Sequence, residues 1–285
     1  MKKLESVKKI LLTSLLFLTA FFEPQNILAI DIDRLQNKTI EIAAEPDYPP
    51  YCFIDENGNP KGFSIELFME SAKAVGLDVK IQIGVWSIIK EDLAEGEIDA
   101  LPLVGRTPER EEFYDFTLPY LTLHGAIFVK EGTHDIKSIN DLKNKKIVVM
   151  KGDNAEEFVR REYISNHIYT TNTFSEAFNK LAAGEFDAVL TQRVMGLKLL
   201  ETMGLNSIVA LDIQVPQFRQ DFCFAVKKGD HELLSILNEG LSIIIANKKF
   251  EEIYEKWFGP IYKEQLSSAE IIKIILYTIV PVLFI

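Results

Sequence analysis

The chain has 285 residues, of which 47% are hydrophobic and 26% are charged, and its formal net charge is −11. This composition is typical of a globular protein that can bury a core in one large domain or in two modest ones. The acidic balance argues against nucleic-acid partners and against a polybasic membrane-surface role, although a local arginine could still oppose the global charge at an anionic ligand.

The two cysteines, Cys52 and Cys223, are too few for a disulfide framework and show no metal-ligand spacing. A bridge between them is possible, but nothing in the sequence supports it. No nucleophile motif, zinc spacing or glycine-rich phosphate loop is present, and the four histidines are scattered. The sequence therefore predicts no catalytic residue, no metal site and no cofactor.

Residues 1–29 have the pattern of a secretory signal peptide. Four of the first nine residues are lysines, an apolar run from Ile10 to Phe22 follows, and 27–29 could serve as a cleavage site. Export from the cytoplasm is therefore predicted, and the segment would remain as an N-terminal anchor if the cleavage site fails.

A strand is predicted over 38–44, because apolar and polar residues alternate there. It leads into a proline-rich turn that carries Glu45, Asp47, Tyr48 and Tyr51. The two tyrosines, held beside stiff proline rings, could form a wall on which a small ligand stacks. Alternatively, they could pack on the surface of a lobe.

A helix over 63–75 and a strand over 79–83 are expected next. Trp86 could be a core residue or could lie at the rim of a cleft. Gly96 ends another helix, since glycine readily adopts the left-handed conformation, and the apolar run 98–104 predicts a strand that is covered on both faces.

Thr107 and Pro108 predict a new helix, as N-cap and first helical residue. Arg110 follows near the tip of the preceding strand, where α/β sheets bind ligands. Its guanidinium could bind a carboxylate through two parallel hydrogen bonds. The alternative is an exposed arginine that pairs with Glu111 or Asp115.

The sequence L-A-E-G-E-I-D-A at 93–100 recurs as L-A-A-G-E-F-D-A at 181–188, after a helix expected over 174–183. Both copies read as a helix, a Gly-Glu turn and a strand that opens with an aspartate. One supersecondary unit used twice predicts two similar α/β lobes, whereas a solenoid would need more repeats. Asp99 and Asp187 are expected to be structural.

Strands at 124–130 and 222–227 are expected to cross between the lobes and to form a hinge. Between them, a strand at 146–150 leads through 152–154 into a helix over 155–163, whose first amides could bind an anionic group. Alternatively, Asp153 or Asn154 could serve only as the N-cap of this helix.

The strand over 186–190 ends with Thr191 and Gln192 at its tip, where they would face a cleft. Two further helices with apolar stripes are expected at 231–246 and 248–257.

Several motifs, in order along residues 38–260, resemble those of the family 3 extracellular solute-binding proteins. In the first half they are D-Y-P-P-Y-C-F-I-D-E-N-G-N-P-K-G-F (47–63), W-S-I-I (86–89), T-P-E-R (107–110) and D-F-T-L-P-Y (115–120). In the second half they are F-C-F-A-V-K-K-G-D (222–230), L-N-E-G-L (237–241) and I-Y-E-K-W-F-G (253–259), which are most similar to ectodomains of sensor kinases and diguanylate cyclases.

The resemblance implies an α/β, two-lobed periplasmic-binding-protein type II (Venus-flytrap) fold with two crossover hinge strands. Lobe 1 would comprise 38–123 and 221–260, and lobe 2 would comprise 124–220. It also implies an extracytoplasmic location, in the periplasm or at the cell surface.

The resemblance further implies a site for a small carboxylate-bearing ligand. Arg110 matches the arginine that holds a ligand carboxylate, whereas Gln192 stands where amino-acid binders place an aspartate for the ligand ammonium group. Gly105 replaces a small hydroxyl residue. An amino acid and an organic acid therefore both remain open as ligands. The implied ligand-binding residues are Asp47, Tyr48, Tyr51, Trp86, Gly105, Arg110, Asp153, Asn154 and Gln192.

Three function classes follow. The first is the sensory part of a membrane-bound receptor, in which 261–285 forms a juxtamembrane segment and the start of a transmembrane helix. The last twelve residues, 274–285, carry no charge, whereas a span needs roughly 20 residues, so a cytoplasmic output domain would be missing from this chain. The second is the substrate-binding protein of an amino-acid-type ABC transporter, with a permease as partner. The third is a hydrolase or dehydratase on the same fold, which the missing motifs argue against.

Overall fold

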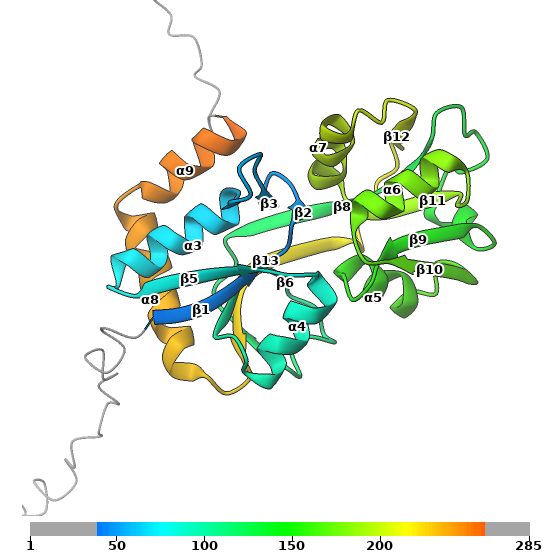
Figure 1. Ribbon diagram of the computed structural model, residues 1–285. Coiled ribbons are helices and arrows are strands. Elements are labelled where there is room, and N and C mark those ends of the chain that lie inside the picture. The colour runs from blue at the N-terminus through cyan, green and yellow to red at the C-terminus, as the bar shows by residue number, and fades with distance from the viewer. Residues whose placement is uncertain (1–38, 260–285) are drawn as a thin grey trace, which may run out of the picture. The chain divides into compact units, whose positions relative to one another are not determined.

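The computed structural model describes residues 39–259 (Figure 1). The predicted signal peptide at 1–29 and the predicted juxtamembrane segment at 261–285 lie outside these residues. Within 39–259, no helix has both the length and the apolar character that a bilayer crossing requires.

One sheet runs through both lobes in the order β10-β9-β11-β8-β13-β6-β1-β5. The strands of the first lobe are β1 (Thr39–Ala44), β5 (Asp78–Ile83), β6 (Ala100–Gly105) and β7 (Tyr114–Phe116). A separate three-stranded sheet consists of β2 (Asp47–Tyr48), β3 (Cys52–Ile54) and β4 (Pro60–Lys61). The helices of this lobe are α3 (Phe63–Ala74), α4 (Trp86–Glu95), α8 (His231–Ala246) and α9 (Lys249–Phe258).

The second lobe contains the strands β9 (Lys146–Met150), β10 (His167–Thr171), β11 (Ala188–Gln192) and β12 (Ile208–Ala210). Its helices are the short 3-10 helix η1 (Ile139–Leu142), α5 (Asn154–Arg161), α6 (Phe174–Ala183) and α7 (Arg193–Met203). Its core is apolar and includes Phe158 and Phe218, whose rings stack with their centroids 4.7 Å apart.

Two long strands, β8 (Leu121–Lys130) and β13 (Arg219–Lys227), connect the lobes. They pair antiparallel over Leu121–His124 and Arg219–Phe222, so that they run side by side between the lobes (Figure 1). The lobe boundaries predicted at 123/124 and 220/221 fall inside these strands. The two connections therefore consist of ordered β-structure, as expected for hinge strands.

The repeated L-A-x-G-E-x-D-A units have the same local structure in both lobes. Gly96 and Gly184 end α4 and α6 in the left-handed conformation, with φ of 86° and 81°. After each turn, an aspartate side chain accepts a hydrogen bond from the neighbouring strand: Asp99 from the Glu41 amide and Asp187 from the Lys146 amide, both at 2.7 Å. The predicted structural role of both aspartates is confirmed.

The helix predicted from Thr107 is wrong. Residues 107–113 form turns, with Arg110 N bonded to Thr107 O and Tyr114 N bonded to Arg110 O. The segment cannot continue as a helix because β7, which starts at Tyr114, pairs with β13. The pairing of β7 with β13 therefore outweighs the local helix-capping signals of Thr107 and Pro108.

Five features were not predicted from the sequence: β7, β10, β12, α7 and the small sheet formed by β2, β3 and β4. The disulfide left open by the sequence is also not formed, because Cys52 and Cys223 are both buried free thiols. Cys52 instead donates a hydrogen bond to the backbone oxygen of Glu45 at 3.2 Å.

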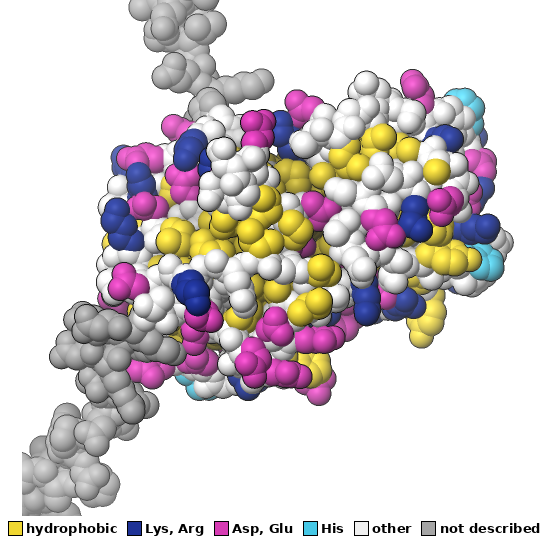
Figure 2. Space-filling model, in the orientation of Figure 1, with side chains coloured by type: hydrophobic (Ala, Val, Ile, Leu, Met, Phe, Trp, Pro, Cys, Tyr) yellow, Lys and Arg dark blue, Asp and Glu magenta, His cyan; other side chains and the backbone are white. Residues whose placement is uncertain are grey.

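The surface reflects the negative net charge of the chain. Figure 2 shows acidic side chains gathered along one edge of the displayed face, over the region of α4. Basic side chains are more dispersed on this face.

Candidate functional site

The turn between β9 and α5 of the second lobe contacts the first lobe at the end of β6 and the start of α4. Gly152 makes this turn with φ of 72°. Its backbone oxygen accepts hydrogen bonds from Trp86 Nε1 at 2.7 Å, from Lys90 Nζ at 3.2 Å and from Arg110 Nη2 at 3.1 Å. A single carbonyl group thus receives three donors from the other lobe.

Arg110 is buried, with only 2% of its surface exposed. Its Nε donates to Glu157 Oε1 on α5 at 2.9 Å, its Nη1 to Gly105 O at 3.0 Å and its Nη2 to Gly152 O. Its guanidinium also lies 5.0 Å from the centroid of the Trp86 ring. Each nitrogen atom of the guanidinium group therefore already donates to an oxygen atom of the protein.

The surface-pair alternative for Arg110 is wrong. Glu111 pairs instead with Arg106, and Asp115 with Lys228. The partner of Arg110 is Glu157, which also accepts a hydrogen bond from Thr107 Oγ1 at 2.7 Å.

Asp47 connects the lobes at a second point. Its Oδ2 accepts a hydrogen bond from the backbone amide of Ser175, in the first turn of α6, at 3.0 Å. Burial raises the pKa of Asp47, whereas this hydrogen bond opposes the rise. A carboxylate at the positive end of a helix is favourable, so the contact stabilises the approach of the two lobes.

Four buried side chains near these contacts carry atoms without a hydrogen-bond partner among the described residues. They are Glu45 and Tyr48 from the first lobe and Thr191 and Gln192 from the second, with 6%, 1%, 0% and 1% of their surfaces exposed. The unpaired atoms are Glu45 Oε2, Tyr48 OH, Thr191 Oγ1 and Gln192 Oε1. Leaving such groups unpaired costs free energy, so their concentration between two lobes indicates a site for a polar ligand.

Further contacts place these residues near one another. Gln192 Nε2 donates to Asn154 Oδ1 at 3.1 Å. Asn154 Nδ2 in turn lies 2.9 Å from the position that a Cβ atom on Gly105 would occupy, so a larger residue at 105 would collide with Asn154. The Tyr48 ring packs edge-on against Phe174 of α6, with centroids 6.0 Å apart.

The site brings several carboxyl groups together away from water. Burial raises the pKa of Glu45 well above its usual value, and repulsion by Asp153 and Asp47 raises it further, while Arg110 opposes the rise. Burial also raises the pKa of Asp153 to about 6, again against the effect of Arg110. Asp153 caps α5 through a 2.8 Å hydrogen bond from the Ala155 amide. The site is therefore rich in buried carboxyl groups.

Among the predicted site residues, Tyr51 meets this cluster through the Tyr48 ring, with centroids 6.3 Å apart. It is buried in the first lobe, where its ring packs against Phe258 of α9 at 5.6 Å. This position corresponds to the packing alternative that the sequence left open. The other eight predicted residues lie at or beside the contacts between the lobes.

Three residues outside the predicted set belong to the same region: Glu45, Glu157 and Thr191. Glu45 and Thr191 could have been found, because each stands at the end of a predicted strand. Glu157 has no such signal, since it is one of two adjacent glutamates in the first turn of α5 and only the folded chain shows which of them faces Arg110.

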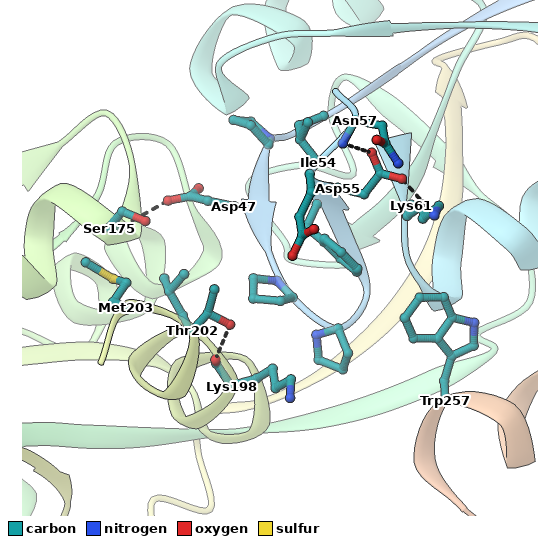
Figure 3. A pocket seen from close by; sticks show the side chains of 16 residues that line it. Asp47, Ile54, Asp55, Asn57, Lys61, Ser175, Lys198, Thr202, Met203 and Trp257 are labelled. Carbon is teal, nitrogen blue, oxygen red and sulfur yellow. Dashed lines mark hydrogen bonds and ion pairs between the residues drawn. The ribbon is translucent and has the colours of Figure 1, made fainter. Parts of the chain in front are cut away.

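Little free volume remains beside Glu45. The cavity there, lined also by Cys52, Trp86 and Leu103, measures about 10 Å³, which is about the space of one water molecule. A larger groove of about 820 Å³ lies on the outer side of Asp47, between the β2–β4 sheet, α7 and Trp257 (Figure 3). A solute can therefore reach Glu45 only if the lobes move apart. Within residues 39–259, no group of acidic, histidine or cysteine side chains could hold a metal ion.

Comparison with known proteins agrees with the two-lobed α/β fold described above. A profile of the bacterial extracellular solute-binding proteins, family 3, matches residues 40–260. The L-cystine-binding protein of Escherichia coli (strain K12) is 29% identical over 223 residues, which cover 78% of this chain and 83% of that protein.

Two solved structures are similar over nearly their whole length. A histidine kinase sensor domain with similarity to periplasmic binding proteins has a TM-score of 0.74 and 30% identity, covering 79% of this chain and 97% of that chain. An ancestral arginine-binding protein bound to arginine has a TM-score of 0.72 and 32% identity, covering 79% of this chain and 100% of that chain. The predicted two-lobed α/β fold is confirmed.

Proposed function

The chain belongs to family 3 of the bacterial extracellular solute-binding proteins, and from this premise we propose that its two lobes close on a small solute of the amino-acid type. The observation that carries the proposal is the set of four buried, unpaired polar atoms that both lobes contribute beside their contacts. Relatives that bind L-cystine and arginine favour an amino acid over an organic acid. Binding, rather than catalysis, accounts for these residues.

We assign the ligand contacts to Glu45, Tyr48, Thr191 and Gln192, with Trp86 and Asp153 beside them. The contacts of Arg110 with Glu157, Gly105 and Gly152 use three of its five N–H donors, so the remaining N–H groups of Nη1 and Nη2 could bind a ligand carboxylate. The contacts of Gly152 with Trp86, Lys90 and Arg110 would break on opening and form again on closure. The ligand shifts this equilibrium by as much as it prefers the closed form.

Trp86 offers a direct test of closure, because the chain has only two tryptophans. In a Trp257→Phe variant, a bound ligand should shift the Trp86 emission to shorter wavelength, since closure buries Trp86 to 4% exposure. Fluorescence titration with the common amino acids and cystine measures this shift. A Trp86→Phe variant, which keeps Trp257, should respond less. No response to any of these compounds at millimolar concentration would contradict the proposal.

We further propose that the domain is the sensory part of a membrane-bound receptor. The similarity to a histidine kinase sensor domain and the uncharged run 274–285 support this assignment. The full chain, expressed with its own N-terminal segment, should sediment with membranes and resist extraction by alkaline carbonate. Release of the whole population as soluble protein would instead favour a transport receptor that delivers its solute to a permease.

A further inference from the structure

We propose that residues 260–266 of this chain, which directly follow α9, bind in the groove between the β2–β4 sheet, α7 and Trp257, so that movement of the lobes also moves the chain that leads out of the domain. This groove is called the outer groove below (Figure 3). Binding of 260–266 in the outer groove does not depend on the proposed function, whereas its coupling to a solute rests on that function.

The outer groove offers an apolar surface. Its volume is about 820 Å³, and apolar side chains form much of its lining, among them Pro49, Pro50, Phe53, Met203 and Trp257. Phe53, Met203 and Trp257 are only half-buried, so part of their apolar surface faces solvent in the groove. A concave apolar surface of this kind is typical of a binding site for another part of a protein or for a partner.

The lysines of the groove are paired with acidic neighbours. Lys61 Nζ lies 2.7 Å from Asp55 Oδ2, and Lys198 Nζ lies 2.8 Å from Glu201 Oε2. Because these charges already have partners, the groove favours an occupant that has apolar side chains and little net charge.

Trp257 is held rigidly at the edge of the groove. Its Nε1 donates to Glu66 Oε2 at 2.9 Å, and its ring packs edge-on against Phe53 with centroids 6.0 Å apart. The indole N–H is the only polar group of a tryptophan side chain, and here it is bonded to Glu66. The ring is therefore fixed in place, and an occupant of the groove needs to offer it only apolar contact.

The segment 260–266 matches the groove in position and in composition. The helix α9 ends at Phe258 and its C-cap is Gly259, two residues after Trp257. The sequence that follows is P-I-Y-K-E-Q-L, with Ile261, Tyr262 and Leu266 as large apolar residues and with one lysine and one glutamate. Its net charge is therefore zero, as the groove favours.

The attachment of 260–266 beside the groove makes weak contacts sufficient. Seven extended residues reach at most about 23–25 Å from the end of α9. A segment joined to its binding site by so short a connection has an effective concentration there of about a millimolar or more. A partner in solution or a second copy of the chain would have to compete with this concentration.

The outer groove is built from both lobes. The β2–β4 sheet and Trp257 belong to the first lobe, whereas Ser175 and α7 belong to the second. Asp47 and Ser175 line the groove from opposite lobes and are joined by a 3.0 Å hydrogen bond (Figure 3). Separation of the lobes would break this bond and move the two walls apart. Binding of 260–266 therefore favours the closed lobes, and a solute that closes the lobes strengthens the binding of 260–266 in return.

Cross-linking in the full chain tests where 260–266 lies. Thr202 is an exposed residue of α7 in the groove wall, and Gln265 is a polar position of the segment. A Thr202→Cys/Gln265→Cys variant should form an intramolecular link with a short bismaleimide, whereas the native thiols react slowly because Cys52 and Cys223 are buried. Absence of this link would overturn the inference. Links that join two chains and increase with protein concentration would show that the groove binds a second copy, and would overturn it as well.

Further substitutions within the segment separate binding in the groove from mere proximity. Ile261→Ser/Tyr262→Ser, added to the cysteine pair, should slow the link at least about tenfold, because it removes the apolar groups that the groove buries. Lys263→Ser/Glu264→Ser changes two neighbouring residues, keeps the apolar ones and should leave the rate within about twofold. Equal rates in these two variants would overturn the inference.

Trp257 fluorescence gives a second measurement that needs no cysteine. In a Trp86→Phe chain, Ile261→Ser/Tyr262→Ser should shift the Trp257 emission to longer wavelength, because the groove then fills with water, and Lys263→Ser/Glu264→Ser should not. The same emission in both variants would overturn the inference.

Addition of an amino acid that binds between the lobes should speed the link between positions 202 and 265. An unchanged rate with the solute bound would overturn the coupling of the segment to the lobes. Failure of every solute to bind would instead contradict the proposed function, and the comparison of the two serine variants would still decide whether 260–266 binds in the groove.

Discussion

Replacing Glu157 by glutamine should strengthen the binding of ligands that carry a carboxylate relative to ligands that lack one. Arg110 would then lie buried without a counter-ion, and a ligand carboxylate would supply the missing charge. We expect arginine to gain at least about 100-fold over agmatine relative to the wild type, measured as the ratio of their dissociation constants. The free variant should also lose about 3 kcal/mol of stability, because one partner of a buried ion pair is removed.

Glu162→Gln is the matched control for this experiment. Glu162 is the exposed C-cap of the same helix, and its ion pair with Arg161 lies at the surface. Such pairs contribute roughly 0–1 kcal/mol, so both affinities should stay close to those of the wild type. If the arginine-to-agmatine ratio of Glu157→Gln equals that of Glu162→Gln, then Glu157 does not control access of carboxylates to Arg110.

Ligand affinity and protein stability should depend on pH in opposite directions. Burial raises the pKa of Asp153 to about 6 and that of Glu45 well above its usual value; Asp47 and Glu157 add repulsion, whereas Arg110 opposes it. Below pH 6, the Asp153 carboxyl group takes up a proton and loses its attraction for a cationic group of a ligand. Affinity for arginine should therefore rise between pH 5 and pH 7, by up to about tenfold per pH unit for each proton released on binding.

The stability of the free protein should instead fall as pH rises over this range. A carboxyl group whose pKa is higher in the folded than in the unfolded chain favours folding below the unfolded pKa, and this contribution is lost as pH rises through the folded pKa. For Asp153, with a pKa raised from 3.8 to about 6, the loss is about 3 kcal/mol. Most of it should fall between about pH 4 and pH 6.

Asp153→Asn isolates this effect, because asparagine is an equally good helix N-cap and carries no charge. Urea unfolding at pH 4 and at pH 7 should show that the wild type loses about 3 kcal/mol relative to the variant across this interval. Equal pH dependence of the two proteins would mean that Asp153 titrates at its ordinary pKa. The raised pKa values of the site would then lose their support.

Elements whose signals are local could be predicted from the sequence. The turns at Gly96 and Gly184 depend on a conformation that glycine adopts without strain, and the aspartates that follow bond to the neighbouring strand in both lobes. The same holds for the strand that ends at Gly105 and for the helix that Asp153 caps. These signals occupy a few consecutive residues and can be recognised without the fold, whereas the expected site residues followed from the resemblance to the family.

Tertiary structure alone decided what the charged groups of the site contact. Thr107 has every local mark of an N-cap, yet the pairing of β7 with β13 limits the residues that follow it to turns, and its hydroxyl group donates to Glu157. Arg110 finds its partner 47 residues further along the chain. Which carboxyl groups become buried without a partner, and therefore which kind of ligand the site favours, depends on the packing of both lobes together. This packing cannot be predicted from a local sequence pattern, because it brings together residues that lie far apart in the sequence.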